Sequence, residues 1–143
     1  MSTGATFFAF YLTEKALPAG KTAAKVDVRQ YRMLVTMTDG TVYALGANTS
    51  GSQGTGSSVT PGITLTAVAM PAGAVVTYIA MANNTTLFLL NTGAVYFAGL
   101  NDTGGRGTGT TGGTDYTPVR VPLAHTADKI TASWYDSYLV ALG

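Results

Sequence analysis

Short apolar segments alternate with glycine-bearing turns along most of the chain. The segments are rich in valine, leucine, tyrosine and threonine, residue types that favour β-strands. Glycine ends the turns Thr38-Asp39-Gly40 and Asn91-Thr92-Gly93, where it supplies the positive φ that such turns need. The predicted strands are Ala24–Val28, Leu34–Met37, Thr41–Leu45, Val75–Met81, Leu87–Leu90, Ala94–Ala98, Lys129–Ala132 and Leu139–Leu142. The pattern predicts an all-β chain of short antiparallel strands.

The chain repeats itself at an offset of 53 residues. The offset brings these repeat-defining residues into register: Gly40 with Gly93, Tyr43 with Tyr96, Gly46 with Gly99, and Asn48 with Asn101. A slightly shorter offset carries Pro71 to Pro122, so a third and partial copy follows. We interpret residues 1–143 as a single repeat domain, with units at approximately 7–59, 60–112 and 113–143, the last one partial.

Each unit has the composition expected of one propeller blade. An apolar or threonine-rich segment ends at a proline, and strand-like segments follow that are joined by an Asp-Gly or Thr-Gly turn. A glycine-rich loop, at 48–56 or 101–109, closes the unit. Three or four short strands that recur about every 50 residues are typical of a β-propeller. The sequence therefore predicts an incomplete β-propeller made of two to three blade-like repeats.

The repeat resembles that of the regulator of chromosome condensation family, whose pattern is roughly Asp-Gly-x-Val-Tyr-x-x-Gly-x-Asn before a glycine-rich loop. Residues 39–48 match this pattern, and residues 93–101 match it again. The sequence departs from the pattern where Arg32 and Thr85 stand at the place of a usual histidine. The resemblance implies a propeller fold that serves protein–protein scaffolding. In one branch of the family it also implies guanine-nucleotide exchange on a small GTPase.

The number of units does not match a complete ring. The resemblance implies seven blades, or about 350 residues at ~50 per blade, whereas this chain has 143. An arc of blades leaves edge strands and a blade face open. Either identical chains complete one ring together, or the arc packs against a different protein. We therefore expect an assembly partner.

The distribution of charge supports a covered surface. Charged residues make up 10% of the chain, and none occurs from Gly40 to Asn101, a stretch that a free surface would normally interrupt with charge. Four basic residues, Lys21, Lys25, Arg29 and Arg32, lie close together in the sequence. With a net charge of +1, we interpret them as a solvated face and expect no nucleic-acid partner.

The sequence offers little material for catalysis or for metal and cofactor binding. It has no cysteine and one histidine, His125, which is too few for a zinc site. The loop 104–109 lacks the Gly-Lys-Ser/Thr ending of a phosphate-binding loop. Asp102 with Asp115, or Asp128 with Asp136, are the only plausible acid pairs, and we expect neither to form an active site. We predict no catalytic, cofactor-binding or metal-binding residues, and no enzymatic activity.

The aromatic residues suggest an interface instead. Trp134, Tyr135 and Tyr138 have no aromatic counterpart in the other unit, and tryptophan and tyrosine are enriched at interface hot spots. A second apolar run near the N-terminus includes Phe7, Phe8 and Phe10. These six residues are the candidate interface. No segment is long and apolar enough for a membrane span, since proline, glycine and threonine break residues 67–82.

Taken together, the sequence predicts a non-enzymatic structural protein that works through protein–protein contacts. A bacteriophage virion component, such as a capsid decoration, head-fibre or tail protein, fits the composition. Its partners would be other copies of itself or other virion proteins, and its location the virion. The alternative is a carbohydrate- or protein-binding propeller that assembles as an oligomer, in a virion or in the cytoplasm. A scaffold of the nucleotide-exchange type is a lesser alternative.

Overall fold

A computed structural model describes residues 15–134 and 137–140, which form strands and no helix. The strands in chain order are β1 (Ala23–Arg29), β2 (Arg32–Met37), β3 (Val42–Gly46), β4 (Gly62–Ala67), β5 (Val76–Met81), β6 (Thr85–Leu90), β7 (Val95–Leu100), β8 (Thr114–Arg120), β9 (Lys129–Ala132) and β10 (Ser137–Val140). The all-β prediction is therefore confirmed. The predicted strands recur with small shifts at their ends, except that Leu139–Leu142 extends beyond the described residues.

The strands form three antiparallel sheets that follow the chain order. Blade 1 is β1-β2-β3-β4, blade 2 is β5-β6-β7-β8, and blade 3 contains β9 and β10 among the described residues. The threonine-rich segments that precede Pro71 and Pro122 become β4 and β8, the fourth strands. Each four-stranded sheet thus groups residues 23–67 or 76–120. The arrangement confirms an incomplete propeller.

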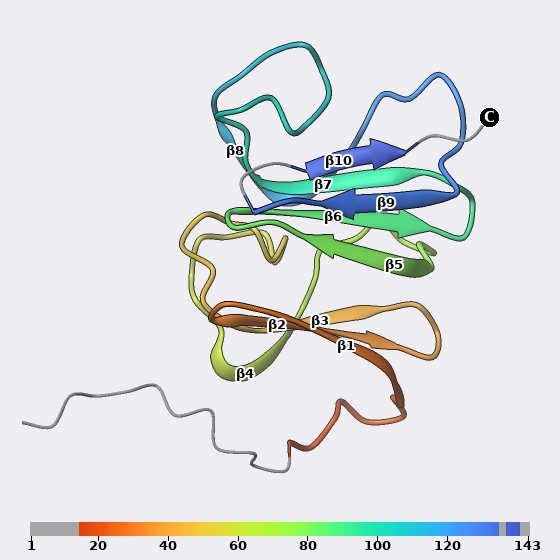
Figure 1. Cartoon of the computed structure of the whole chain (residues 1–143). Coiled ribbons are helices and arrows are strands. Elements are labelled where there is room, and N and C mark those ends of the chain that lie inside the picture. The colour runs from red at the N-terminus through yellow and green to blue at the C-terminus, as the bar shows by residue number, and fades with distance from the viewer. Residues whose placement is uncertain (1–14, 135–136, 141–143) are drawn as a thin grey trace, which may run out of the picture.

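The blades are stacked face to face rather than side by side (Figure 1). Leu34, Val42 and Ala44 of blade 1 pack against a blade 2 face that includes Ile79 and Phe88. The opposite face of blade 2 packs against the start of blade 3, where Ile130 is buried. Because blade 2 is covered on both faces, all six residues of β6 are buried. A strand buried on both faces is expected to be a continuous apolar run rather than an alternating one.

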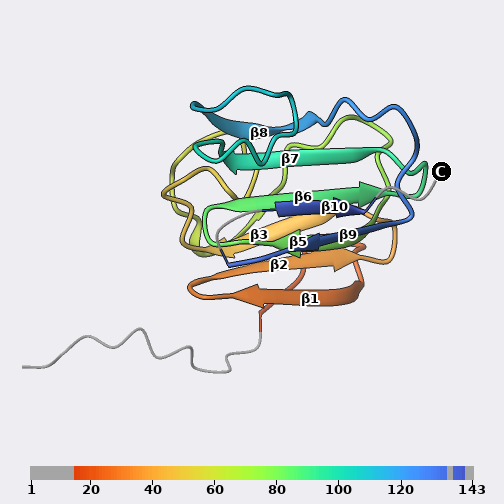
Figure 2. The ribbon, with the colours of Figure 1, turned by 45° about the horizontal axis from the view of Figure 1, so that its top comes forward.

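The two ends of the strands have different connections (Figures 1 and 2). At one end lie the tight turns between β2 and β3 and between β6 and β7. At the other end lie the tips of the first hairpins of blades 1 and 2 and the long loops that follow β3 and β7. We call this second end the loop end. It brings together segments that are about one blade apart in the sequence.

Candidate functional site

Gly40 and Gly93 hold consecutive blades together. The carbonyl oxygen of Gly40 accepts a hydrogen bond from the Val76 amide at 3.0 Å, and that of Gly93 accepts one from the Ala127 amide at 2.9 Å. A Cβ atom at Gly40 would lie 2.5 Å from the Val75 side chain. The turn glycine therefore lets the next blade approach its backbone closely, which explains its place in the repeat.

Gly46 and Gly99 hold the strands within each blade. Both have positive φ, and a Cβ atom at Gly46 would lie 2.1 Å from the Tyr31 carbonyl oxygen. At Gly99 the corresponding distance to the Asn84 carbonyl oxygen is 2.2 Å. The same carbonyls accept hydrogen bonds from the next amides along, those of Ala47 and Leu100. These two glycines fix the first hairpin of each blade against its third strand.

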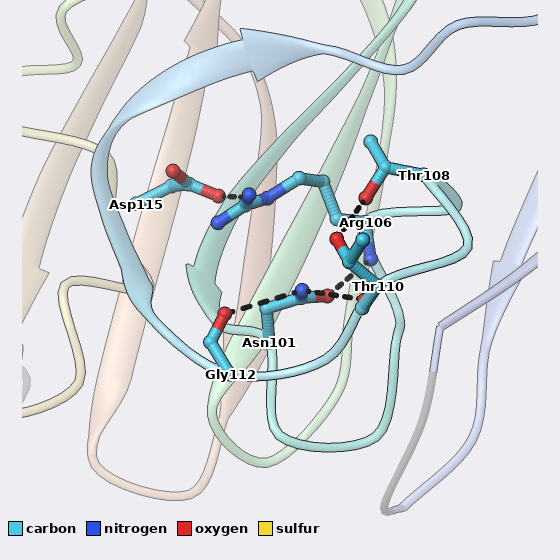
Figure 3. Close-up of polar contacts among 6 residues, drawn as sticks. All are labelled: Asn101, Arg106, Thr108, Thr110, Gly112 and Asp115. Atoms are coloured by element: carbon cyan, nitrogen blue, oxygen red, sulfur yellow. Dashed lines mark hydrogen bonds and ion pairs between the residues drawn. The ribbon is translucent and has the colours of Figure 1, made fainter.

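Asn48 and Asn101 fasten the long loops. Both side chains are fully buried. The Asn101 Nδ2 donates to the carbonyl oxygens of Thr110, at 3.0 Å, and Gly112, at 3.3 Å, while its Oδ1 accepts from the Arg106 amide at 2.9 Å (Figure 3). Asn48 does the same in blade 1, because its Oδ1 accepts from the Gln53 amide and its Nδ2 donates to the Ser57 carbonyl. A buried amide that bonds on both sides closes each loop.

The two loops differ at the residue five positions after the asparagine, whose backbone amide donates to the asparagine Oδ1. In blade 1 this residue is Gln53, which is buried and donates to the Leu45 carbonyl. In blade 2 it is Arg106, whose Nε donates to Asp115 Oδ2 at 2.6 Å (Figure 3). Tyr43 and Tyr96 are partly buried, and Tyr96 packs against the core between blades 1 and 2. The eight repeat-defining residues thus hold the turns, the loops and the packing of the blades.

One face of blade 1 is open. Val26 pairs with Val35 across β1 and β2, on the side opposite Leu34, because side chains alternate along a strand. Val26 and Val28 are 51% and 62% exposed. The residues one repeat later, Ile79 and Met81, are 4% and 8% exposed because blade 1 covers them. We define the open face as the exposed Val26 and Val28 of β1 with the half-buried Met33, Tyr43 and Leu45; Val35 and Met37 lie on the same side of the sheet but are buried.

The loop end joins all three blades through a basic and aromatic cluster. The Arg29 guanidinium lies 5.1 Å from the centre of the Trp134 ring. The Asn83 amide donates to the Trp134 carbonyl at 3.0 Å, and Arg32 Nη2 donates to the Ala82 carbonyl. The first hairpins of blades 1 and 2 and the start of the third blade's turn therefore meet at this point.

The prediction that the four clustered basic residues form a solvated face is wrong for Arg32. Arg32 is only 4% exposed. Burial, together with the nearby positive charge of Arg29, lowers the pKa of Arg32 from 12.5 to about 10. The reason lies in the repeat: Arg32 stands at the first position of β2, which the next blade covers. Lys21 and Lys25 instead pair with Asp39 and Asp27.

The candidate interface residues are only partly within the described ranges. Trp134 is half exposed and takes part in the loop-end cluster. Tyr138 pairs with Thr131 across β9 and β10. Phe7, Phe8, Phe10 and Tyr135 lie outside the described residues. The structure thus places one of the six side chains at a junction between blades.

Of the four aspartates in the two acid pairs that the sequence suggested, Asp102, Asp115 and Asp128 are described, and Asp136 lies outside the described residues. Asp115 pairs with Arg106, as described above, while Asp102 and Asp128 are exposed. Within residues 15–134 and 137–140, no three histidine, cysteine or acidic side chains come together as a metal site would need. In the same ranges, no helix has the length and apolar character to cross a membrane.

Sequence reasoning identified the glycines and asparagines but missed the Arg29, Arg32 and Trp134 cluster. Trp134 is about 100 residues from the two arginines in the sequence. The repeat offset relates neither arginine to a basic residue in blade 2. One signal was available. Arg32 occupies a position where the family pattern has a different residue, and it stands two residues before the predicted strand Leu34–Met37.

Comparison with known proteins agrees with this architecture. No family model and no curated protein matches the chain in sequence. Human WBSCR16 is similar in structure, with a TM-score of 0.72 and 18% identity over 83% of this chain and 30% of that one. Yeast RCC1 (Prp20), solved bound to Kap60, gives a TM-score of 0.67 and 16% identity over 83% of this chain and 30% of its own.

A second structure of Prp20 from Saccharomyces cerevisiae gives a TM-score of 0.68 and 15% identity, over 85% of this chain and 31% of that one. That protein has binding properties toward Gsp1p and histones. The chain thus has the fold of an RCC1-like β-propeller and spans about a third of the length of these proteins. The fold expected from the resemblance is confirmed.

Proposed function

We propose that this chain is a non-enzymatic assembly protein that acts through the open face of blade 1. The observation that carries the proposal is the exposure of Val26 and Val28, at positions where Ile79 and Met81 are buried by the preceding blade. Full burial of a valine side chain contributes about 1.5–3 kcal/mol. A partner that covers this face as blade 1 covers blade 2 gains part of that contribution from each of Val26 and Val28.

The neighbours in structure support protein binding as the general activity. Prp20 has been solved with Kap60 and has binding properties toward Gsp1p and histones, all of which are proteins. The shared fold makes a protein partner the natural occupant of an open blade face. A scaffold of the nucleotide-exchange type remains the lesser alternative, because this chain spans only about a third of those propellers.

We further propose that the assembly is a virion, in which the chain serves as a capsid decoration, head-fibre or tail protein. The support is compositional: the uncharged stretch from Gly40 to Asn101 suits a surface that neighbouring subunits cover. The proposed partners are copies of the chain or other virion proteins.

The mass of the purified protein in solution, measured by light scattering, tests the proposed surface. We expect assemblies heavier than the 14.7 kDa chain, and we expect Val28→Lys to shift them to monomers without lowering the melting temperature. Val59→Lys is the matched control, because Val59 is also an exposed valine but lies in the loop after β3.

Two results would separate the possible partners. Discrete dimers or trimers that dissociate on Val28→Lys would show that copies of the chain cover the face. A wild-type monomer that captures a neighbouring structural protein through Val28 would show a different partner. A soluble monomer that behaves like Val28→Lys in both assays would contradict the proposal.

A further inference from the structure

We propose that the loop end between blades 1 and 2 carries an oxyanion-binding site, in which Arg32, with the positive charge of Arg29 beside it, receives a group of the size of phosphate or a carboxylate. The site is separate from the open face of blade 1. It rests on the burial, the missing partners and the surroundings of the two guanidinium groups.

The hydrogen-bonding capacity of Arg32 is only partly used. Its Nη2 donates to the Ala82 carbonyl and reaches the Thr85 carbonyl at 3.4 Å. Its Nε and Nη1 are buried and have no hydrogen-bond partner within the structure's described part. Buried polar atoms are nearly always hydrogen-bonded, and a guanidinium has five donors in a planar fork that fits an oxyanion with two oxygens. Arg32 is therefore short of an acceptor.

Among the described residues, no acid forms an ion pair with Arg32. Its direct partner in the register of β1 and β2 is Arg29, a second cation. The Arg29 Nε is also buried without a partner in the described ranges. Asp27 lies on the same face of the strand, where its Oδ1 pairs with Lys25 at 2.9 Å and its Oδ2 is buried without a hydrogen-bond partner among the described residues. A buried cation such as Arg32, with the partly buried Arg29 beside it, is costly without an anion.

A cavity adjoins the unpartnered arginine. It has a volume of about 90 Å³ and is lined by Arg32 together with hydroxyl and amide side chains, including Thr49, Ser50, Asn83 and Asn84. This volume has room for a small oxyanion. Hydroxyl and amide groups can donate to the remaining oxygens.

The arginines are not part of the common scaffold. One repeat later, Ala82 and Thr85 stand in their places, and blade 2 forms the same hairpin without them. The glycines and asparagines that build the blade are present in both copies, whereas the arginine pair occurs once. Its role is thus specific to the junction of blades 1 and 2.

Trp134 provides a direct probe, because it is the only tryptophan and it stacks on Arg29. We expect its fluorescence to change saturably on titration with inorganic phosphate, at fixed pH and at an ionic strength held constant with sodium chloride. Arg32→Gln should weaken phosphate binding at least about tenfold, because it removes a charge-assisted hydrogen-bond donor. Arg29→Gln should weaken it as well, because it removes the positive charge beside Arg32. Arg120→Gln, which removes an exposed arginine at the end of β8, should leave the affinity unchanged.

If Arg32→Gln does not fold, Arg29→Gln still tests the site. Arg29 is less buried than Arg32, so its replacement should disturb the fold less. Circular dichroism and the melting temperature establish folding for each variant. A linear response, a response equal to that of chloride, or equal affinities in Arg29→Gln and Arg120→Gln would overturn the proposal.

The same titration with acetate identifies the form of the anion. Stronger binding of phosphate than of acetate would assign the site to a phosphate group, and the reverse order would assign it to a carboxylate such as an acidic side chain of a partner. Saturable binding of either one supports an oxyanion site at Arg32.

Discussion

The repeated glycines are required where neighbouring atoms leave no room for a side chain, and Gly46 allows a test of this. A Cβ atom there would lie 2.1 Å from the Tyr31 carbonyl oxygen, and the residue has a φ of +87°. Gly73 has a similar φ of +76° but open space around it. We expect Gly73→Ala to cost about 1–2 kcal/mol for the left-handed backbone alone. Gly46→Ala should cost about 2–5 kcal/mol, because steric overlap is added.

Chemical denaturation of the two variants measures this difference. If Gly46→Ala and Gly73→Ala lowered the free energy of unfolding by the same amount, the close approach of the first hairpin to β3 would not be what requires glycine.

The hydrogen bonds of the Asp39 carboxylate should make the stability of the fold depend on acid pH. The Lys21 ammonium, and the hydroxyl and amide of Thr41, bond its carboxylate and hold its pKa well below the usual value of 3.8. A lowered pKa in the folded state stabilises the fold above pH 3.8, and this contribution is lost as the pH falls further. We expect the melting temperature of the wild type to fall more steeply below about pH 4 than that of Asp39→Asn.

Melting temperatures between neutral pH and about pH 2 check this expectation. Asp102→Asn is the control, because Asp102 is an exposed aspartate in the loop after β7. An equal acid dependence in wild type and Asp39→Asn would show that the Lys21 contact does not persist in solution.

At the scale of elements, Asn101 decides whether the loop after β7 stays closed. Asn101→Ala removes its hydrogen bonds to Thr110, Gly112 and the Arg106 amide. We expect a loss of about 1–3 kcal/mol in the free energy of unfolding, because buried backbone groups lose their partners. Trypsin should then cut after Arg106 faster than in the wild type.

Thr108→Ala serves as the control in the same loop, because its hydroxyl bonds only the exposed Thr110 hydroxyl. Its effect on stability should stay within about 0.5 kcal/mol. Equal cleavage rates in Asn101→Ala and Thr108→Ala would contradict the role of the buried amide as a latch.

The elements were largely predictable because the blade is a local structure. Each sheet joins strands that follow one another in the chain, so alternation, turn glycines and the repeat offset carry enough information to identify them. The threonine-rich fourth strands show no strong apolar alternation, since most residues of β4 are exposed. They were recognisable mainly by their position before a proline.

The loop-end cluster was not predictable for the opposite reason. It forms where the hairpin tips of different blades meet, and that meeting depends on how the sheets stack. An offset identifies equivalent residues, such as Arg32 and Thr85, but it does not say that Arg32 reaches the Ala82 carbonyl of the next blade. The burial of Arg32 could therefore be learned only from the packed structure.

At the scale of the whole molecule, equivalent positions in blades 1 and 2 should differ in their importance. Ile79→Ala should lower the free energy of unfolding by about 2–5 kcal/mol, because Ile79 is buried between two blades. Val26→Ala should change it by no more than about 0.5 kcal/mol in the isolated chain. Under assembly conditions, Val26→Ala should weaken association instead.

Denaturation and light scattering on the same two variants separate these effects. A large loss of stability in monomeric Val26→Ala would mean that the open face is already covered by the chain itself.

The complete burial of β6 has a consequence for how the molecule opens. This strand is hydrogen-bonded to β5 and β7 and lies between packed faces on both sides, so water reaches its amides only when two blade interfaces separate. Its amide hydrogens should exchange with deuterium more slowly than those of β1 or β9, which need only one interface to open. Local unfolding would then proceed from the outer blades inward, and the middle blade would be the last part to lose its structure.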